Sequence, residues 1–283
     1  MSRTRTVGLL RLFRLELPFA AGVCVILGIL LATGRQAPPK ETVLGFLSVF
    51  FLSAAALILN DYFDIESDRI NAPDRPLPAG LVSAQDVVVL SIVVTLFGLV
   101  TAGLISPAAL LAAILVWAAG FLYNWRLKKT GFLGNLLVCF SVGMTFIYGG
   151  IAAGKPFEAT VWLFGAMAML VDLGEEIAAD AMDVAGDREA GSRSLALRLG
   201  SENALRISGL IFLLVIIASS LPFLLGWLNW IYLLPLAFMD LAILYCTARL
   251  LDPRTANRRT VIRWIYVSAT AALLIFIIIR MVS

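Results

Sequence analysis

Residues 60–68 read NDYFDIESD, and three aspartates in this run follow one another at gaps of three and four positions. Residues 180–187 read DAMDVAGD and repeat the same gaps. Side chains three or four residues apart share one face of a helix, so each run directs several carboxylates the same way. The spacing predicts two matched carboxylate clusters, Asp61, Asp64 and Asp68 in the first and Asp180, Asp183 and Asp187 in the second.

Each cluster follows a long apolar segment. The chain of 283 residues is 60% hydrophobic and only 14% charged, whereas soluble domains carry about 25% charged residues. Windows of about 20 apolar residues cross a bilayer, and nine such windows take up most of the chain: 15–33, 42–60, 86–105, 108–126, 132–153, 160–178, 205–225, 228–251 and 261–282. We therefore expect an all-α membrane protein with nine transmembrane helices in one bundle around a central cavity. Residues 1–283 are expected to form a single polytopic domain.

The basic residues divide unevenly between the two sides that nine alternating spans define. Of the 22 lysines and arginines, 18 fall on the side of the N-terminus and four on the other side. Because cytoplasmic loops carry the excess of basic residues, we expect a cytoplasmic N-terminus and an external C-terminus in the cell membrane. Both clusters lie on the N-terminal side, since four spans separate them, so the active site is expected to be cytoplasmic.

Several classes of chemistry are excluded by composition. The chain has no histidine, and its three cysteines, Cys24, Cys139 and Cys246, all lie within apolar windows, which argues against a zinc site or a disulfide framework. A net charge of +3 is too small and too scattered to indicate a nucleic-acid partner, and no obligatory protein partner is evident. Catalysis must therefore rest on carboxylates, cations and a metal.

The carboxylate clusters themselves indicate a metal. Clustered carboxylates at the end of a membrane helix repel one another and need a compensating positive charge. Oxygen ligands without histidine or cysteine suit a hard cation, and Mg²⁺ typically binds through a few carboxylates while it bridges substrate phosphates. We therefore expect Mg²⁺ as cofactor. The alternative, two ordinary solvated helix ends, does not account for the repeated spacing.

Cationic and aromatic residues flank the clusters. The loop at 69–80, RINAPDRPLPAG, contains three prolines and a glycine, which predicts a rigid, non-helical connection. Arginines next to the clusters, Arg75 and Arg193, suit phosphate oxygens, although they also serve as topology signals. Arg11 and Arg14, three residues apart on the entering helix, are candidates to bind a second phosphate.

Further candidates lie in or near the apolar windows. Tyr123 and Lys128 are placed to close a phosphate site, although a topology signal with an interfacial aromatic explains them equally well. An aromatic ring that faces a cavity, such as Tyr148, stabilises a carbocation through its quadrupole. Asp172 lies two turns before the second cluster and extends its acidic face, whereas the pattern gives no explanation for Asp240.

These motifs resemble a known family. Residues 60–68, followed by DRPLPAG at 74–80, resemble the signature of the UbiA superfamily of intramembrane prenyltransferases. Residues 180–187 resemble the second motif of that family, and Tyr123, Lys128, Gly134 and Asn135 resemble its middle motif. The resemblance extends over nearly the whole chain.

The resemblance implies an isoprenyl diphosphate, held through two Mg²⁺ ions, as donor of a prenyl group to a lipophilic acceptor within the membrane lipids. Four aspartates are then catalytic, namely Asp64, Asp68, Asp183 and Asp187. The implied metal ligands are Asn60, Asp61, Asp64, Asp68, Asp180, Asp183 and Asp187, with the role of Asp61 less well defined. The implied substrate-binding residues are Arg14, Arg75, Tyr123, Lys128, Arg193 and Tyr148.

The acceptor is less constrained. The sequence of residues 68–76, DRINAPDRP, is most similar to that of family members that join a geranylgeranyl chain to a glycerol phosphate lipid. Prenylation of an aromatic acceptor, as in quinone or chlorophyll-type synthesis, remains an alternative. A divalent-cation transporter is an alternative of another class, but it would carry polar residues through the full membrane thickness, and only Asp172 and Asp240 offer any.

Overall fold

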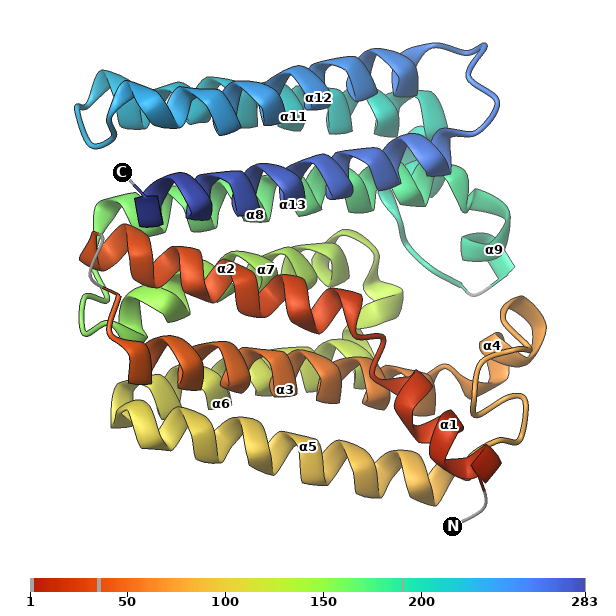
Figure 1. Cartoon of the computed structure of the whole chain (residues 1–283). Helices are drawn as coiled ribbons and strands as arrows, with labels where there is room; N and C mark the ends of the chain where they lie inside the picture. The colour runs from red at the N-terminus through yellow and green to blue at the C-terminus, as the bar shows by residue number, and fades with distance from the viewer. Residues whose placement is uncertain (1–2, 35–36, 190, 283) are drawn as a thin grey trace.

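The computed structural model describes residues 3–34, 37–189 and 191–282, and every regular element in these ranges is helical. Figure 1 shows the helices lying roughly side by side in one bundle. The elements are α1 (Arg3–Leu12), α2 (Glu16–Thr33), α3 (Pro39–Phe63), α4 (Ile65–Asn71), α5 (Ala84–Ile105), α6 (Pro107–Leu122), the π-helical turn η1 (Tyr123–Leu127), the 3-10 turn η2 (Lys128–Thr130), α7 (Phe132–Ala152), α8 (Ala159–Met182), α9 (Val184–Glu189), α10 (Leu195–Leu199), α11 (Ser201–Leu224), the 3-10 turn η3 (Trp230–Tyr232), α12 (Leu233–Leu251) and α13 (Arg258–Val282).

The long helices correspond to the nine apolar windows. Within the described residues, eight segments are long and apolar enough to cross a membrane, and they comprise α2, α3, α5, α6 with η1 and η2, α7, α11, η3 with α12, and α13. The remaining long helix, α8, has 24 residues and is about 36 Å long, but it is less apolar because it carries Asp172, Glu175 and Glu176. The expected all-α membrane-protein fold is therefore confirmed, and the window at 160–178 corresponds to a long helix, α8, with partly buried acids.

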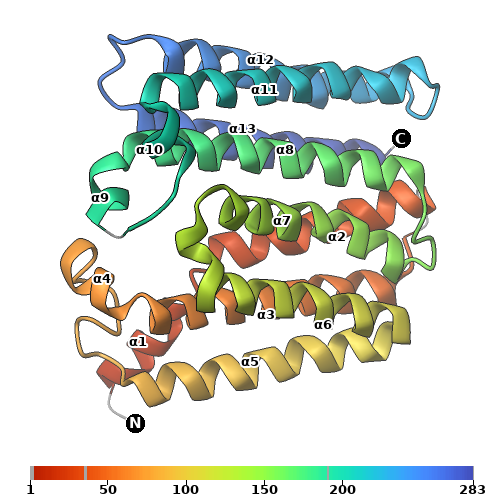
Figure 2. The ribbon, with the colours of Figure 1, turned by 180° about the vertical axis from the view of Figure 1, so that it is seen from behind.

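The order of packing leaves a space in the centre of the bundle. α2 packs against α3 and α7, α7 packs against α8, and α13 packs against both α8 and α2. α5 lies outside α3, and α11 lies outside α8 (Figures 1 and 2). The side chains that line the central space come from α2, α3, α6, α7, α8, α12 and α13.

Small residues allow the close helix contacts around this space. A Cβ atom on Gly28 of α2 would lie 2.3 Å from the carbonyl oxygen of Phe146 of α7, and one on Gly149 would lie 2.5 Å from the carbonyl oxygen of Val25. Any side chain at these two positions would separate the backbones, and in a membrane such packing supplies much of the helix–helix attraction. The two glycines thus fix the distance between α2 and α7.

The short helices that follow the two motifs lie at one end of the bundle. α4 and α9 both lie at the end that also holds α1, whereas α13 finishes at the opposite end (Figures 1 and 2). We call the end with α4 and α9 the motif end. The two termini lie at opposite ends of the bundle, as an odd number of membrane-spanning helices requires, and both motifs lie at the same end (Figure 1).

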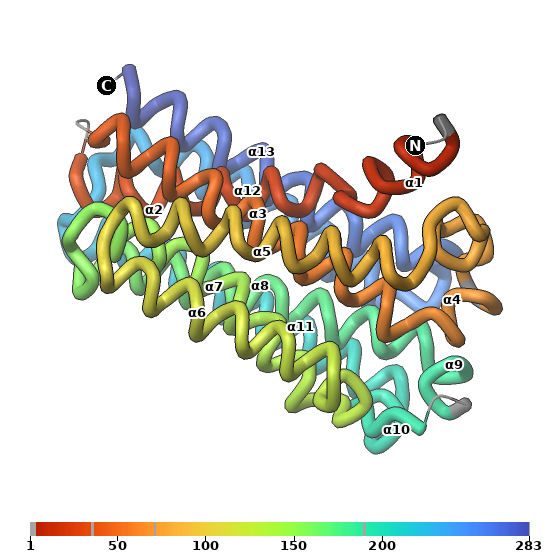
Figure 3. The backbone as a smooth tube through the Cα atoms, turned by 90° about the horizontal axis from the view of Figure 1, so that it is seen from below, coloured from red at the N-terminus to blue at the C-terminus, as the bar shows by residue number. Residues whose placement is uncertain are grey.

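Two local expectations were wrong. Arg11 and Arg14 do not share a helix face, because α1 ends at Leu12 and Arg14 lies in the break before α2 with a φ of 43°. α1 therefore stands apart at the edge of the bundle (Figure 3). The 69–80 connection is not wholly non-helical either, since its first residues belong to α4.

The structure also gives a partner to the acid that the sequence left unexplained. The Ser219 hydroxyl group of α11 donates a 2.6 Å hydrogen bond to Oδ2 of Asp240 of α12. A hydrogen bond between neighbouring helices reduces the cost of placing a carboxyl group in a membrane span. Asp240 therefore joins α11 to α12, and it is absent from the lining of the central space.

Candidate active site

The two motifs are built in the same way. α3 ends at Phe63, Asp64 caps it, and the short α4 follows; α8 ends at Met182, Asp183 caps it, and the short α9 follows. The backbone NH of Asp64 donates to the carbonyl oxygen of Asn60 at 2.9 Å, and that of Asp183 donates to the carbonyl oxygen of Asp180 at 3.2 Å. Each motif is thus a helix end that turns at its middle aspartate, and it is not one continuous helix face.

The carboxylates of the first motif are held by two arginines. Asp61 is 1% exposed; it accepts a hydrogen bond from Arg14 and lies 3.8 Å from Nη1 of Arg75. Nη1 of Arg75 also donates to both carboxylate oxygens of Asp68 at 2.6 Å. Arg75 therefore ties the loop after α4 to both ends of the motif, and Arg14 ties the break between α1 and α2 to α3.

The segment between α6 and α7, formed by η1 and η2 and called the middle segment below, completes this cluster. Lys128 forms an ion pair with Asp64. Asn124, in the π-helical turn, accepts a 2.9 Å hydrogen bond from the Asn60 side chain and donates to the carbonyl oxygen of Ala56 at 3.2 Å. Short π-helical turns occur often at functional sites. Here the turn joins α6 to α3 directly beside the first motif.

The second motif has fewer partners. Nδ2 of Asn135 donates to Oδ2 of Asp180 at 2.9 Å, and Arg259 of α13 forms an ion pair with the exposed carboxylate of Asp183. Oδ2 of Asp187 is buried without a hydrogen-bond partner. An unpaired buried carboxylate oxygen is costly, which is typical of a position that receives a ligand.

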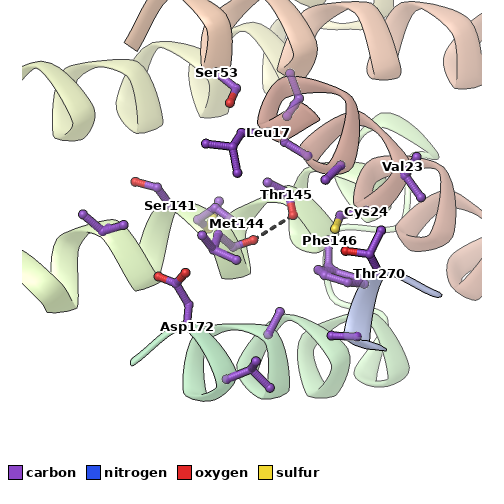
Figure 4. Close-up of a pocket in the computed structure, with 18 of the residues that line it drawn as sticks. Leu17, Val23, Cys24, Ser53, Ser141, Met144, Thr145, Phe146, Asp172 and Thr270 are labelled. Carbon is purple, nitrogen blue, oxygen red and sulfur yellow. Dashed lines mark hydrogen bonds between the residues drawn. The ribbon is translucent and has the colours of Figure 1, made fainter. Parts of the chain in front are cut away.

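A large apolar cavity begins at the motifs. It has a volume of about 670 Å³ and is lined at the motif end by Arg14, Asn60, Tyr123 and Glu176. Tyr123 is within electrostatic range of Asp64 on one side and Asp180 on the other. Farther in, the walls carry mostly hydrophobic side chains, and Figure 4 shows one close-up of them. The cavity can hold a long apolar chain while its polar end stays between the motifs.

The donor set fits Mg²⁺ in its chemistry. All candidate ligands in the two motifs are oxygen donors, as a hard cation prefers. In the part of the chain that the structure describes, no three acidic or sulfur side chains are gathered as they would be around a bound ion. Arginine and lysine side chains pair with four of these carboxylates instead, namely Asp61, Asp64, Asp68 and Asp183.

The structure brings most of the predicted residues together, with two exceptions. The Tyr148 hydroxyl group lies beside the cavity but donates a 3.0 Å hydrogen bond to Ser48, and the tyrosine is 2% exposed. Arg193 is exposed, and its backbone lies against Gly131, where a Cβ atom would be 2.1 Å from the Arg193 carbonyl oxygen. Arg193 is therefore near the middle segment without an ion pair among the described residues.

Sequence reasoning missed several residues of this region. Arg259 lies 76 positions from its partner Asp183, and among many loop cations nothing marked it. Asn124 neighbours the predicted Tyr123 but was not singled out. Glu175 and Glu176 line the cavity, and the gap of four between Glu176 and Asp180 was the available signal.

The chain is similar in sequence and fold to several known proteins. The digeranylgeranylglyceryl phosphate synthase of Thermococcus kodakarensis is 34% identical over 269 residues, which cover 93% of this chain and 94% of the relative. A solved structure of a digeranylgeranylglyceryl phosphate synthase has a TM-score of 0.80 at 29% identity and covers 99% of both chains. A UbiA homolog from Archaeoglobus fulgidus, bound to GPP and Mg²⁺, shares the fold with a TM-score of 0.71 at 18% identity, over 98% of this chain and 100% of that one.

The sequence model of the UbiA prenyltransferase family matches residues 21–269. This range includes both aspartate motifs, the middle segment and most of the cavity wall. The transporter alternative is thereby set aside. The chain is a multi-pass membrane enzyme that belongs to the UbiA prenyltransferase family.

Proposed function

We propose that the enzyme transfers a geranylgeranyl group from its diphosphate to a hydroxyl group of a geranylgeranylglyceryl phosphate lipid, with Mg²⁺ as cofactor. The observation that carries this proposal is the apolar cavity of about 670 Å³ that ends between two carboxylate motifs and their basic partners. An isoprenyl diphosphate has the same division into a long apolar chain and a charged end. The proposal treats residues 1–283 as one catalytic domain.

Six side chains are proposed to hold the metal ions, namely Asn60, Asp64, Asp68, Asp180, Asp183 and Asp187. When bound, Mg²⁺ neutralises the diphosphate and stabilises the charge that develops on it as it leaves. The buried, unpartnered oxygen of Asp187 supports this assignment for the second motif. Asp61 differs from the other six, because it is 1% exposed and pairs with two arginines, Arg14 and Arg75. We therefore assign to Asp61 the role of an anchor for these arginines.

The basic residues are proposed to exchange partners when the donor binds. Lys128 and Arg75 neutralise Asp64 and Asp68 in this structure, and both side chains are close enough to turn from a carboxylate to a phosphate oxygen. Arginine binds phosphate with two parallel hydrogen bonds. Arg193 is exposed beside the middle segment and is a further candidate for the diphosphate, whereas Arg14 at the cavity mouth is the candidate for the phosphate of the acceptor.

The cavity walls are proposed to protect the reactive carbon. Breaking the bond between the allylic carbon and the diphosphate leaves positive charge on that carbon, and an apolar wall excludes the water that would capture it. Aromatic faces stabilise such charge through their quadrupole, and Tyr123, Trp117 and Tyr148 line the cavity. Tyr148 is held in place by Ser48, so its ring rather than its hydroxyl group is available.

The choice of acceptor rests on the relatives and on the loop wording. Two relatives, 34% and 33% identical over most of this chain, are digeranylgeranylglyceryl phosphate synthases. The sequence of residues 68–76 also suggested a glycerol phosphate lipid. The positive-inside distribution of 18 of 22 cations supports a cytoplasmic motif end in the cell membrane. The apolar chains of both substrates would then lie in the membrane, and their charged ends would reach the site at its cytoplasmic side.

The test is a transfer assay with purified protein, Mg²⁺ and labelled geranylgeranyl diphosphate. The acceptors are geranylgeranylglyceryl phosphate, the same lipid without its phosphate, and an aromatic acid. We expect a labelled lipid ether from the first acceptor and at least tenfold less from the other two. Preferred transfer to the aromatic acid would overturn the acceptor, and transfer that persists in EDTA would overturn the metal requirement.

A further inference from the structure

Three carboxylates on α8 lie in the cavity beyond the motifs. Asp172, Glu175 and Glu176 all line it, and none belongs to the two aspartate runs. Figure 4 shows Asp172 projecting from α8 into the space that faces Ser141 and Met144 of α7. Acidic side chains within a membrane span are costly and are retained mainly where they act on a substrate, a proton or an ion.

These carboxylates have few compensating partners, namely the Cys139 thiol group beside Asp172 and the charge of Lys128 near Glu176. Oδ2 of Asp172 and Oε1 of Glu175 are buried without a hydrogen bond. Among the described residues, no hydrogen bond or ion pair reaches the Glu176 carboxylate. Arg14 is the one cation in the cavity lining that the structure describes, and it is paired with Asp61. The acids are therefore available to a ligand inside the cavity.

Their depth along α8 separates their roles. Glu176 lies one turn from Asp180, about 6 Å along the helix axis, and Asp172 lies about 12 Å from it. With the diphosphate held between the motifs, as proposed above, its allylic carbon would enter the cavity near Glu176, which is the lining carboxylate nearest to Asp180 along α8. Asp172 lies one turn deeper than Glu176, and the charge of Glu175 acts on Cys246 of α12 and Tyr266 of α13.

We propose that Glu176 is the general base that accepts the proton of the acceptor hydroxyl group. This inference rests on the proposed function. The bond between the allylic carbon and the diphosphate oxygen breaks, and its electron pair leaves with the diphosphate. The acceptor oxygen forms the new bond to carbon, and the hydroxyl proton passes to a carboxylate oxygen of Glu176. Glu176 contacts the acceptor in this step and is a catalytic residue.

The surroundings of Glu176 suit this task. The charged or titratable groups that face it are Lys128 from η2, Tyr123 from η1, Cys139 from α7, and Asp172, Glu175 and Asp180 from its own helix. Lys128 is paired with Asp64, and the chain contains no histidine that could serve as the base. Beyond Glu176 the cavity walls are mostly apolar, so bulk water is a poor substitute for a fixed proton acceptor.

The experiment measures two products of the same reaction in wild type and in Glu176→Gln: the prenylated acceptor, and the diphosphate released. General-base catalysis contributes about 10²–10⁴ in rate. We therefore expect transfer to fall at least a hundredfold in Glu176→Gln while diphosphate release falls less than tenfold. The prenyl group should then be recovered as the free alcohol, formed when water that enters from the open motif end supplies the hydroxyl oxygen and releases its proton to solvent. Glu176→Asp keeps a carboxylate and should recover at least a tenth of wild-type transfer, even where Glu176→Gln folds poorly.

Matched variants separate the proposal from a structural role. Glu202→Gln removes an exposed acid from α11 and should keep transfer within fivefold. Asp172→Asn removes an acid one turn deeper in the cavity and should keep the wild-type ratio of transfer to diphosphate release. Equal loss of transfer and diphosphate release in Glu176→Gln, or transfer within threefold of wild type, would overturn the role of Glu176. Uncoupling in Asp172→Asn alone would overturn it as well.

The acceptor panel keeps this test distinct from the test of the proposed function. Wild-type protein alone decides which acceptor is prenylated. The ratio of transfer to diphosphate release in each variant is then measured with the acceptor that wild type uses, because an alcohol and an aromatic ring both lose a proton on prenylation. A wrong acceptor therefore leaves the Glu176 measurement intact.

Discussion

Asp61→Asn tests the assignment of the most buried carboxylate of the first motif. Asparagine keeps the shape and one acceptor oxygen but removes the charge that faces Arg14 and Arg75. At the 3.8 Å that separates the Asp61 carboxylate from Nη1 of Arg75, two charges interact by about 4 kcal/mol at an effective dielectric constant of about 20. The side chains of Arg14 and Arg75 are 29% and 35% exposed. Solvent screening therefore reduces the expected loss of unfolding free energy in Asp61→Asn to about 2 kcal/mol.

This loss should appear as a lower thermal midpoint of the protein in detergent, by about 5 °C. Adding Mg²⁺ and diphosphate should raise the midpoint of Asp61→Asn more than that of wild type, because the ligand supplies the missing negative charge to the arginines. The Mg²⁺ concentration that gives half-maximal activity should stay within twofold. Glu66→Gln, which removes an exposed carboxylate from the same motif, is the control and should shift neither quantity.

Two results would refute the reasoning. A tenfold or larger rise in the half-saturating Mg²⁺ concentration would make Asp61 a metal ligand and not an anchor. A midpoint shift below 1 °C would mean that the arginines do not depend on Asp61.

Three further predictions concern the motifs, the topology and the middle segment. Asp64→Ala and Asp183→Ala should each abolish transfer, with unchanged elution in size-exclusion chromatography; activity within a few-fold of wild type in both would contradict the ligand assignment. Ser67→Cys should react with a membrane-impermeant thiol reagent only after the cells are broken, and labelling of intact cells would reverse the topology. Gly131→Ala should destabilise the protein by at least about 2 kcal/mol in thermal unfolding, because φ is 69° and a Cβ atom would lie 2.1 Å from the Arg193 carbonyl oxygen; an unchanged midpoint would show that the two loops separate freely.

The sequence predicted the bundle and the two clusters because both depend on local composition and spacing. Apolar windows reveal the spans directly. The equal gaps in the two runs, with four spans between them, were enough to bring α4 and α9 to one end (Figure 1). The break at Asp64 and Asp183 was not predictable, because gaps of three and four look the same on a continuous helix and on two helices joined at a cap.

The pairing of charges could not be predicted either. Asp61 and Asp64 are three residues apart, yet one binds Arg14 and the other binds Lys128. Which cation reaches which carboxylate depends on how the break after α1 and the π-helical turn aim their side chains, and these features have no periodic signal. Glu176 was overlooked for a different reason, because an apolar window is recognised by its average and tolerates a few acids.

The central claim is that the allylic carbon–oxygen bond breaks and that the acceptor supplies the oxygen of the product. Geranylgeranyl diphosphate with ¹⁸O in the bridging position tests this directly when products are analysed by mass spectrometry. The account predicts that all ¹⁸O is recovered in the released diphosphate and that the lipid ether carries only ¹⁶O. Product lipid that contains ¹⁸O, or diphosphate without it, would contradict the account.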